Sequence, residues 1–296
     1  MIIERIDIDG ISYTLDTDLQ TAIVDGGNTD KPFTTISIPK IVTYDSINYT
    51  VTSIERGAFQ SCSELLNVSI ALDSMITSIG QDAFRGCIKL TSINIPRLVT
   101  TINQLTFQGC SSLLTVSIPT NSMLTNIGVQ AFDSCSSLSS IHMPNGLIDI
   151  GFIAFVFCSA LSSITIPNTV TNIDGFAFYQ CSRLSSVYFL QTVTLPTIGT
   201  NAFLNIATPS TAYYIKTINN ANTLYSYGFT NIQEINTSDP SKPTNSNELL
   251  LALNDDQITN IYIQNDIQSE NRSLTVDKLK ILSNGSLSSL PVSLFL

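Results

Sequence analysis

The sequence is poor in charge and in the residues that most often carry chemistry. It has no Trp, one His and 12% charged residues, whereas roughly 25% is usual in globular proteins. The net charge of -10 excludes an extensive basic surface for nucleic acid. No stretch approaches about 18 uninterrupted apolar residues, which excludes a membrane-spanning helix. Hydrophobic residues make up 43% of the chain, which argues against charge-driven disorder and for a packed core.

The N-terminal segment does not have the pattern of a secretory signal. Such a signal needs a basic start followed by roughly 7–15 apolar residues. Here the acidic residues Glu4 and Asp7 interrupt the apolar segment almost at once. We therefore expect a protein that is cytoplasmic or assembled in a virion, with its thiols in the reduced state.

Framework residues recur at fixed spacings through most of the chain. Successive Cys residues are 25, 23, 25, 23 and 23 positions apart. Each Cys follows a Phe by three residues, and each of these Phe residues follows an Ile by five. The two series are Phe59, Phe84, Phe107, Phe132, Phe155, Phe178 and Phe203, and Cys62, Cys87, Cys110, Cys135, Cys158 and Cys181. A period of this length indicates a repeat architecture.

Each repeat combines short extended pieces with one tight turn. Segments such as Ile93–Ile95 alternate apolar and polar residues with the period of a strand. The stretch from Ala83 to Leu90 spaces its apolar residues by three, which is typical of a single helical or 3₁₀ turn. One coil cannot bury its own apolar face, whereas stacked coils layer Ile on Ile and Phe on Phe. The predicted fold is a β-rich solenoid of short parallel strands, and the two extra residues of the longer coils are predicted to lie in a loop on one face.

The repeat pattern resembles the BspA-type leucine-rich repeat family. The residues that carry this resemblance are Ile79-Gly80, Ala83-Phe84, Cys87, Leu90, Ile93 and Ile95-Pro96, with their copies. Asp9–Leu15 and Leu224–Ile232 resemble the cap and the closing segment of the family. The resemblance implies a leucine-rich repeat solenoid and a non-catalytic role in binding or adhesion. The expected organisation is a capping β-hairpin in residues 1–35, the solenoid in 36–235, a linker in 236–247 and a tail in 248–296.

The Cys residues have three competing interpretations. Zinc needs four ligands that converge tetrahedrally, whereas equivalent positions of a solenoid form a straight line. Disulfides are disfavoured because the Cβ vectors of equivalent positions run parallel. The favoured interpretation is a ladder of buried thiols that fill space as small apolar side chains. No metal or other cofactor is expected.

His142 is the only residue that a Ser-His-Asp triad could use. No Gly-x-Ser-x-Gly motif accompanies it, and Asp149 belongs to a different part of the coil. No phosphate-binding loop or dinucleotide-binding motif is present either. We therefore expect that the protein is not an enzyme.

The outward positions of the predicted strands form a nearly uncharged strip rich in hydroxyl groups. This strip could be a generic polar coat or a protein-binding surface, on which His142 and Tyr188 would be the anchors because aromatic side chains concentrate binding energy. The predicted partner-binding residues are Asn94, Ser117, His142, Thr165 and Tyr188. The leading hypothesis is a non-enzymatic protein-interaction module that presents this strip.

The apolar C-terminus suggests a second hypothesis. In this alternative the protein is a structural component of a virion or another large, symmetric assembly, like a minor capsid or cement protein. It would be anchored to a partner through its tail. The predicted anchor residues are Leu290, Val292, Leu294, Phe295 and Leu296.

Overall fold

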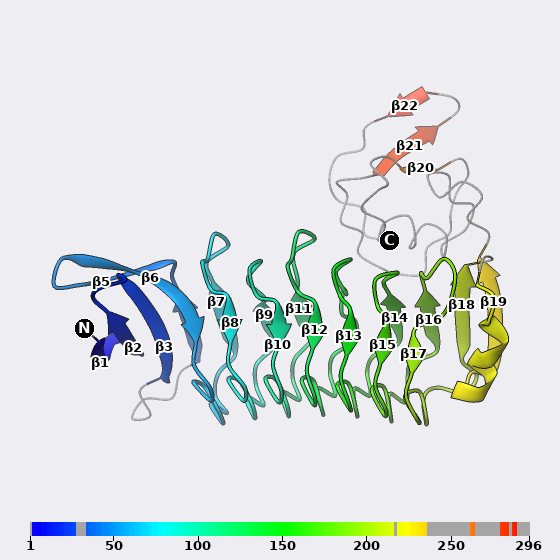
Figure 1. Cartoon of the computed structure of the whole chain (residues 1–296), viewed down its shortest axis with the longest axis horizontal. Coiled ribbons are helices and arrows are strands. Elements are labelled where there is room, and N and C mark those ends of the chain that lie inside the picture. The colour runs from blue at the N-terminus through cyan, green and yellow to red at the C-terminus, as the bar shows by residue number, and fades with distance from the viewer. Residues whose placement is uncertain are drawn as a thin grey trace.

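The chain forms a solenoid of about eight turns, shown in Figure 1 as a computed structural model. The structure describes residues 2–27, 34–215 and 218–235. It also describes the short strands β20 (Ile261–Ile263), β21 (Leu279–Ser283) and β22 (Ser286–Ser288), in which β21 pairs with the other two. The predicted linker 236–247 and the anchor residues of the tail lie outside the described residues.

The N-terminal end begins with an antiparallel meander. Strands β1 (Ile2–Ile8) and β2 (Ile11–Asp16) form a hairpin around the Asp9-Gly10 turn, and β3 (Thr21–Gly27) pairs with β2. Strand β3 then pairs in parallel with β6 (Ile47–Ile54), which also pairs with β5 (Ile41–Tyr44). The meander therefore covers the first edge of the parallel ladder, which would otherwise be open to further pairing.

A long parallel ladder continues from β6 along the solenoid. Each coil contributes a two-residue strand whose Ile is buried and pairs with the Ile of the next coil. These strands are β8 (Ser78–Ile79), β10 (Thr101–Ile102), β12 (Asn126–Ile127), β13 (Asp149–Ile150), β15 (Asn172–Ile173) and β17 (Thr197–Ile198).

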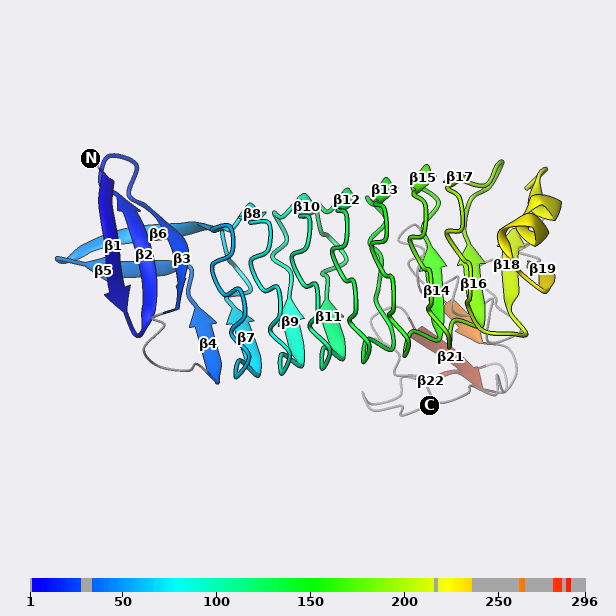
Figure 2. The same ribbon diagram turned by 90° about the horizontal axis from the view of Figure 1, so that it is seen from below.

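A second face of the solenoid carries two shorter parallel ladders, which lie in one row in Figure 2. The first consists of β4 (Thr35–Ile38), β7 (Asn67–Ile70), β9 (Ser92–Asn94) and β11 (Thr115–Ser117). The second consists of β14 (Ser163–Ile166), β16 (Ser186–Phe189), β18 (Thr211–Ile215) and β19 (Asn231–Ile235). We call this the strand face. The longer loops between β7 and β8 and between β11 and β12 rise above the others in Figure 1, as the extra residues predict.

The predicted strand around His142 is absent from this face. No strand is assigned to residues 139–143, so the row is interrupted between β11 and β14. Ile141 and Met143 are still buried and His142 is exposed. The alternation of side chains therefore predicted the packing of this segment correctly but overestimated its backbone pairing.

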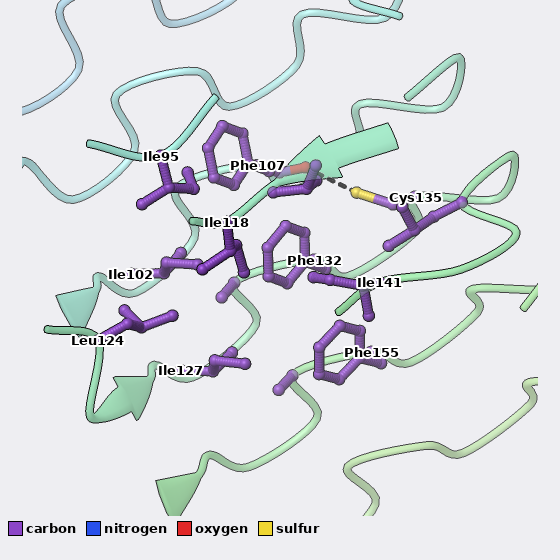
Figure 3. Packing of buried hydrophobic residues seen from close by; sticks show 14 of the residues in the cluster. Ile95, Ile102, Phe107, Ile118, Leu124, Ile127, Phe132, Cys135, Ile141 and Phe155 are labelled. Atoms are coloured by element: carbon purple, nitrogen blue, oxygen red, sulfur yellow. Dashed lines mark hydrogen bonds between the residues drawn. The ribbon is translucent and has the colours of Figure 1, made fainter. Parts of the chain in front are cut away.

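A continuous column of aromatic rings fills the interior. Seven buried Phe residues stack from coil to coil, with ring centroids 5.1–5.6 Å apart and planes within 14° of parallel. Figure 3 shows Phe107, Phe132 and Phe155 in this column, beside rows of Ile. We number the coils 1 to 7 by these residues, from Phe59 to Phe203. The predicted layering of Phe on Phe and Ile on Ile is confirmed.

The Cys residues form a second internal column. All six are free thiols, and those of coils 2 to 6 are fully buried. Each of these five thiols donates a hydrogen bond of 3.1–3.2 Å to the carbonyl oxygen of the core Phe in the preceding coil. The thiol ladder expected from the sequence is therefore present, and its hydrogen bonds tie neighbouring coils together.

The turn that follows each two-residue strand places its backbone amides against the next coil. In coil 4, for example, the amide of Ser134 donates 2.8 Å to the carbonyl of Val156, and that of Phe132 donates 2.8 Å to Ala154. Hydroxyl groups add further links, such as Thr125 Oγ1 to the carbonyl of Thr100 at 3.1 Å. These hydrogen bonds pair the polar backbone groups of the turns and join neighbouring coils without charged side chains.

The C-terminal end of the ladder is covered by a 3₁₀ helix, η1 (Ala221–Tyr227), and by β19. Phe229 contacts Phe203 at a centroid distance of 5.0 Å, and Phe189 meets both rings edge-on at 6.2 Å. This cluster ends the Phe column, because it covers the last ring with aromatic side chains of other segments.

Candidate partner-binding face

The strand face carries the outward strip predicted from the sequence. Along β4, β7 and β11 the residues Ser37, Ser69 and Ser117 are exposed, while Ile36, Val68 and Val116 beside them are buried. The alternation follows from the pleat of a strand, in which neighbouring side chains point to opposite faces. The first ladder therefore presents hydroxyl and amide groups above an apolar layer.

A groove of about 780 Å³ opens over this ladder at its N-terminal end. Its lining combines hydroxyl and amide side chains of β4, β7, β9 and β11 with Ile8, Asp9, Ile11 and Tyr13 from the N-terminal hairpin. Among the described residues of this lining, Asp9 is the one that carries a charge. Burial, together with the charge of Asp9, raises the pKa of Tyr13 to about 12, so its phenol stays neutral. The described lining of the groove therefore combines apolar side chains with uncharged polar ones and one carboxylate.

The contribution of the N-terminal hairpin to this groove was not predicted. The Asp9-Gly10 turn predicts the hairpin itself, because Asp-Gly favours tight turns between strands. Its position beside β4 depends on contacts between segments distant in sequence, and no local signal specifies them. Strip residues Asn94 and Ser117 line the groove, whereas His142, Thr165 and Tyr188 are not in its lining.

Asn94 has a structural contact on the strand face. Its Oδ1 accepts a hydrogen bond of 3.1 Å from the amide of Ile70, and its Nδ2 donates 2.9 Å to the carbonyl of the same residue. The side chain thus pairs both backbone groups of Ile70, at the end of β7. A role for Asn94 in binding a partner stays a prediction, and the structure adds a role in joining β7 to β9.

Tyr188 occupies its predicted strand position but differs in exposure. Its ring stacks on Tyr213 of β18 at 4.5 Å and 10°, and it packs against Ile235 of β19. Only 4% of Tyr188 is accessible. Rings at equivalent positions of adjacent strands remove their faces from water by stacking, so Tyr188 is not the projecting anchor expected from the sequence. Thr165, its neighbour on β14, is half-buried.

The buried thiols are protected from ionisation. Burial raises the pKa of Cys110 and Cys181 to about 12 and that of Cys135 and Cys158 well above the ordinary range. A thiol reacts as a nucleophile or metal ligand through its thiolate. These side chains are therefore suited to packing and not to chemistry.

Two further properties concern metals and membranes. Within the described residues, no three His, Cys, Asp or Glu side chains come together in a way that would hold a metal ion. In that same part of the chain, no helix is long and apolar enough to cross a lipid bilayer.

The stacked coils, the parallel ladders and the inward Phe, Ile and Leu columns define a leucine-rich repeat solenoid. The family model for the BspA type leucine rich repeat region matches residues 31–155, 120–236 and 150–275, with six copies. The chain therefore belongs to the BspA-type leucine-rich repeat family, as its repeat motif predicts. Repeats of this class are generally protein-interaction modules without catalytic activity.

Several solved structures are similar to this chain. A leucine-rich repeat protein from Bacteroides ovatus is 24% identical, with a TM-score of 0.47 over 78% of this chain and 76% of that chain. The T. pallidum leucine rich repeat protein is 21% identical, with a TM-score of 0.42 over 77% of this chain and 98% of that chain. The pneumococcal vaccine antigen PcpA is 15% identical, with a TM-score of 0.36 over 90% of this chain and 94% of that chain. No curated protein matches the chain.

Proposed function

We propose that the protein is a non-enzymatic interaction module that binds a protein partner across the first ladder of the strand face. The observation that carries this proposal is the groove over β4, β7, β9 and β11, whose lining is rich in hydroxyl and amide groups and almost uncharged. Its floor is built on parallel strands that are hydrogen-bonded to their neighbours. A rigid, preorganised surface loses little conformational entropy on binding.

The partner of such a face would be recognised by hydrogen bonds and shape more than by charge. Exposed Ser37, Ser69 and Ser117 offer both donors and acceptors. The half-buried Ile8 and Pro39 add apolar surface to the lining of the groove. Binding would therefore combine a small apolar contact with hydrogen bonds at the rim, as in protein interfaces generally. His142, which is exposed beyond β11, would extend the contact.

Site-specific photo-crosslinking tests the proposal. A photoreactive amino acid at Ser69 or Ser117 should give one defined adduct in an extract of the native source, and unlabelled wild-type protein should compete for it. The double variant Ser69→Lys/Ser117→Lys should not compete, because two bulky charges would block the strip. The control carries the same photoreactive group at Asp73, which is exposed on the loop after β7. Equal labelling from Asp73, or full competition by the double variant, would contradict the proposal.

A further inference from the structure

The turns that follow the two-residue strands form the lower edge of the solenoid in Figure 1, and this edge changes character along its length. In coils 1 to 4 it is mainly polar, apart from Leu105 and Val129, and is hollowed by a cavity of about 440 Å³ lined by Gln, Ser, Gly and Arg. In coils 5 and 6 it carries bulky apolar residues instead. We call this part the aromatic edge, which consists of Phe152, Ile153, Phe157, Phe176 and Tyr179.

Equivalent positions in other coils show how local this change is. Phe157 stands where coils 1 to 4 have Ser61, Gly86, Gly109 and Ser134. Backbone hydrogen bonds place these positions side by side, for the amide of Ser134 donates to Val156 and that of Phe157 to Tyr179. Coil 5 also has Ile148 where five other coils have Thr. The apolar residues are therefore concentrated at one place on a regular scaffold.

Two rings of the aromatic edge are exposed, and those of Phe176 and Tyr179 are half-buried. Phe152 is 43% exposed and Phe157 is 50% exposed. Phe176 meets Phe152 at 79° and Tyr179 at 85°, with centroids 5.9 and 5.5 Å apart. Neighbouring rings are therefore arranged edge to face, and the edge of one ring attracts the face of another in aromatic pairs. A copy of the same surface is therefore chemically complementary to it.

The aromatic-edge residues include three that stand at turn positions where the backbone is left-handed in every coil. Ile153, Phe157 and Phe176 have φ values of 49°, 59° and 57°, in the left-handed region. Other coils often have Gly, Ser, Asp or Asn at these positions, and such residues adopt this conformation more readily than bulky or β-branched ones. A bulky residue at such a position costs stability, as it does at Leu105 of coil 3, and coils 5 and 6 together carry three of them.

The charges around the aromatic edge favour a second copy of the chain. Residues 148 to 205 contain only Asp149, Asp174 and Arg183 as acids and bases, although the whole chain carries a net charge of -10. Both carboxylates accept hydrogen bonds within the chain, from Asn126 at 3.0 Å and from Asn172 at 2.9 Å. Two copies of an acidic protein repel each other, and they would meet with little repulsion at this nearly uncharged edge.

We propose that two copies of the chain associate weakly through their aromatic edges about a two-fold axis. An antiparallel arrangement would place coil 5 of each copy against coil 6 of the other and bury Phe157 and Phe176 at the centre. The exposed parts of Phe152 and Phe157 amount to roughly 80–100 Å² each, whereas a stable interface needs about 800 Å² per partner. The dimer is therefore in equilibrium with the monomer and forms as the concentration rises.

Sedimentation velocity of the full chain over two orders of magnitude in concentration tests this proposal. The wild type should shift from monomer towards dimer, and added salt should strengthen association because it screens the net charge. In the variant Phe157→Ser/Phe176→Gln, each Phe is replaced by the residue that coil 4 has at the equivalent position, Ser134 and Gln130. This variant should weaken dimerisation at least tenfold. The matched control Leu72→Ser removes a residue that is 95% exposed on the loop after β7 and should dimerise as the wild type does.

Three results would overturn the proposal. These are a wild type that stays monomeric at every concentration, a double variant that dimerises as strongly as the wild type, and an equal loss in Leu72→Ser. Thermal unfolding of each variant verifies that it is folded. The strand-face variant Ser69→Lys/Ser117→Lys should not weaken dimerisation, so the failure of this proposal and the failure of the proposed partner binding are distinguishable.

Discussion

The thiol of Cys135 donates a hydrogen bond of 3.2 Å to the carbonyl oxygen of Phe107, in the preceding coil (Figure 3). The same contact recurs in four other coils. The thiol is a weak donor, and it adds a second hydrogen bond to a carbonyl that already accepts one from the amide of Cys110. The contact fits because Cys is small enough to lie beside the stacked Phe rings. The Cys series is therefore part of the packing between coils.

The thiols should differ sharply in reactivity. Cys62 of coil 1 is half-buried, whereas the other five are fully buried. With a thiol reagent at pH 8, the native protein should react at one position at most, and the unfolded protein should react at all six. The variant Cys62→Ser should abolish the native reaction. Rapid labelling of Cys135 or Cys158 in the native state would contradict the buried column.

Stability should fall in alkaline solution. Burial raises the thiol pKa in the folded state, so the stabilisation is fully present below the ordinary thiol pKa of about 8.5 and decreases as the pH rises above it. Each such thiol should lower the free energy of unfolding by about 1.4 kcal/mol per pH unit above about pH 9. Urea unfolding at several pH values measures this slope. Cys135→Ala should reduce the slope by the share of one thiol, and an unchanged slope would show that Cys135 ionises in the folded state.

The Phe column should be sensitive to truncation at its centre. Phe132 stacks on Phe107 and Phe155 at 5.3 and 5.1 Å. Phe132→Ala should lower the free energy of unfolding by about 3–5 kcal/mol, because it leaves a cavity between two rings. Phe132→Leu should cost less, since it retains most of the buried apolar volume. Urea unfolding compares both with Phe152→Ala, which removes an exposed ring of the neighbouring coil and should have a much smaller effect.

Asn94 should prove more important for stability than its neighbours in the strip. Asn94→Ala removes both hydrogen bonds to Ile70 and should cost about 1–3 kcal/mol in the free energy of unfolding. Asn94→Asp should lower the free energy of unfolding at least as much. It replaces Nδ2, which lies 2.9 Å from the carbonyl oxygen of Ile70, with a carboxylate oxygen that this carbonyl repels. The exposed Ser117→Ala is the control and should change stability by less than about 0.5 kcal/mol. If Asn94→Ala were as stable as the control, the two hydrogen bonds to Ile70 would not contribute to stability and the prediction would be wrong.

The periodic features of the fold could be predicted from the sequence because the residues that specify them recur in each repeat. Phe107 and Phe132 occupy equivalent positions in successive coils, so the stacking of one ring on the next follows from the period alone. The thiol column beside Cys135 follows in the same way. A motif that recurs six or seven times also distinguishes inward from outward residues, since only the inward ones are restricted in type.

Features that occur once were harder to predict. The exposure of Tyr188 depends on Tyr213, which lies in a segment without the repeat motif. The groove depends on how the hairpin around Asp9 meets the first ladder. The aromatic edge is visible in the sequence as Phe152 and Phe157, but the exposure of these two rings became evident only from the structure. In each case the missing information was a contact or an exposure that the repeat does not encode.

Ile153 is expected to lower the stability of the fold through its backbone conformation, and it also belongs to the proposed dimer interface. A β-branched residue at φ 49° is strained by roughly 1–2 kcal/mol, and Asn, which coil 7 has at Asn201, tolerates this conformation better. Ile153→Asn should therefore raise the free energy of unfolding by about 1 kcal/mol, as measured by urea unfolding of the monomer. The control Ile148→Thr removes an exposed apolar side chain of the same coil at a position without a left-handed φ. It should leave stability within about 0.5 kcal/mol of the wild type.

Self-association of the same variants separates the two contributions of Ile153. If Ile153 has a strained backbone and also contributes to the dimer interface, Ile153→Asn should be more stable than the wild type and should dimerise less in sedimentation velocity. A variant that is less stable than the wild type would show that packing of Ile153 outweighs its backbone strain. A variant that is more stable and dimerises normally would place Ile153 outside the interface and leave its strained conformation without a role in association.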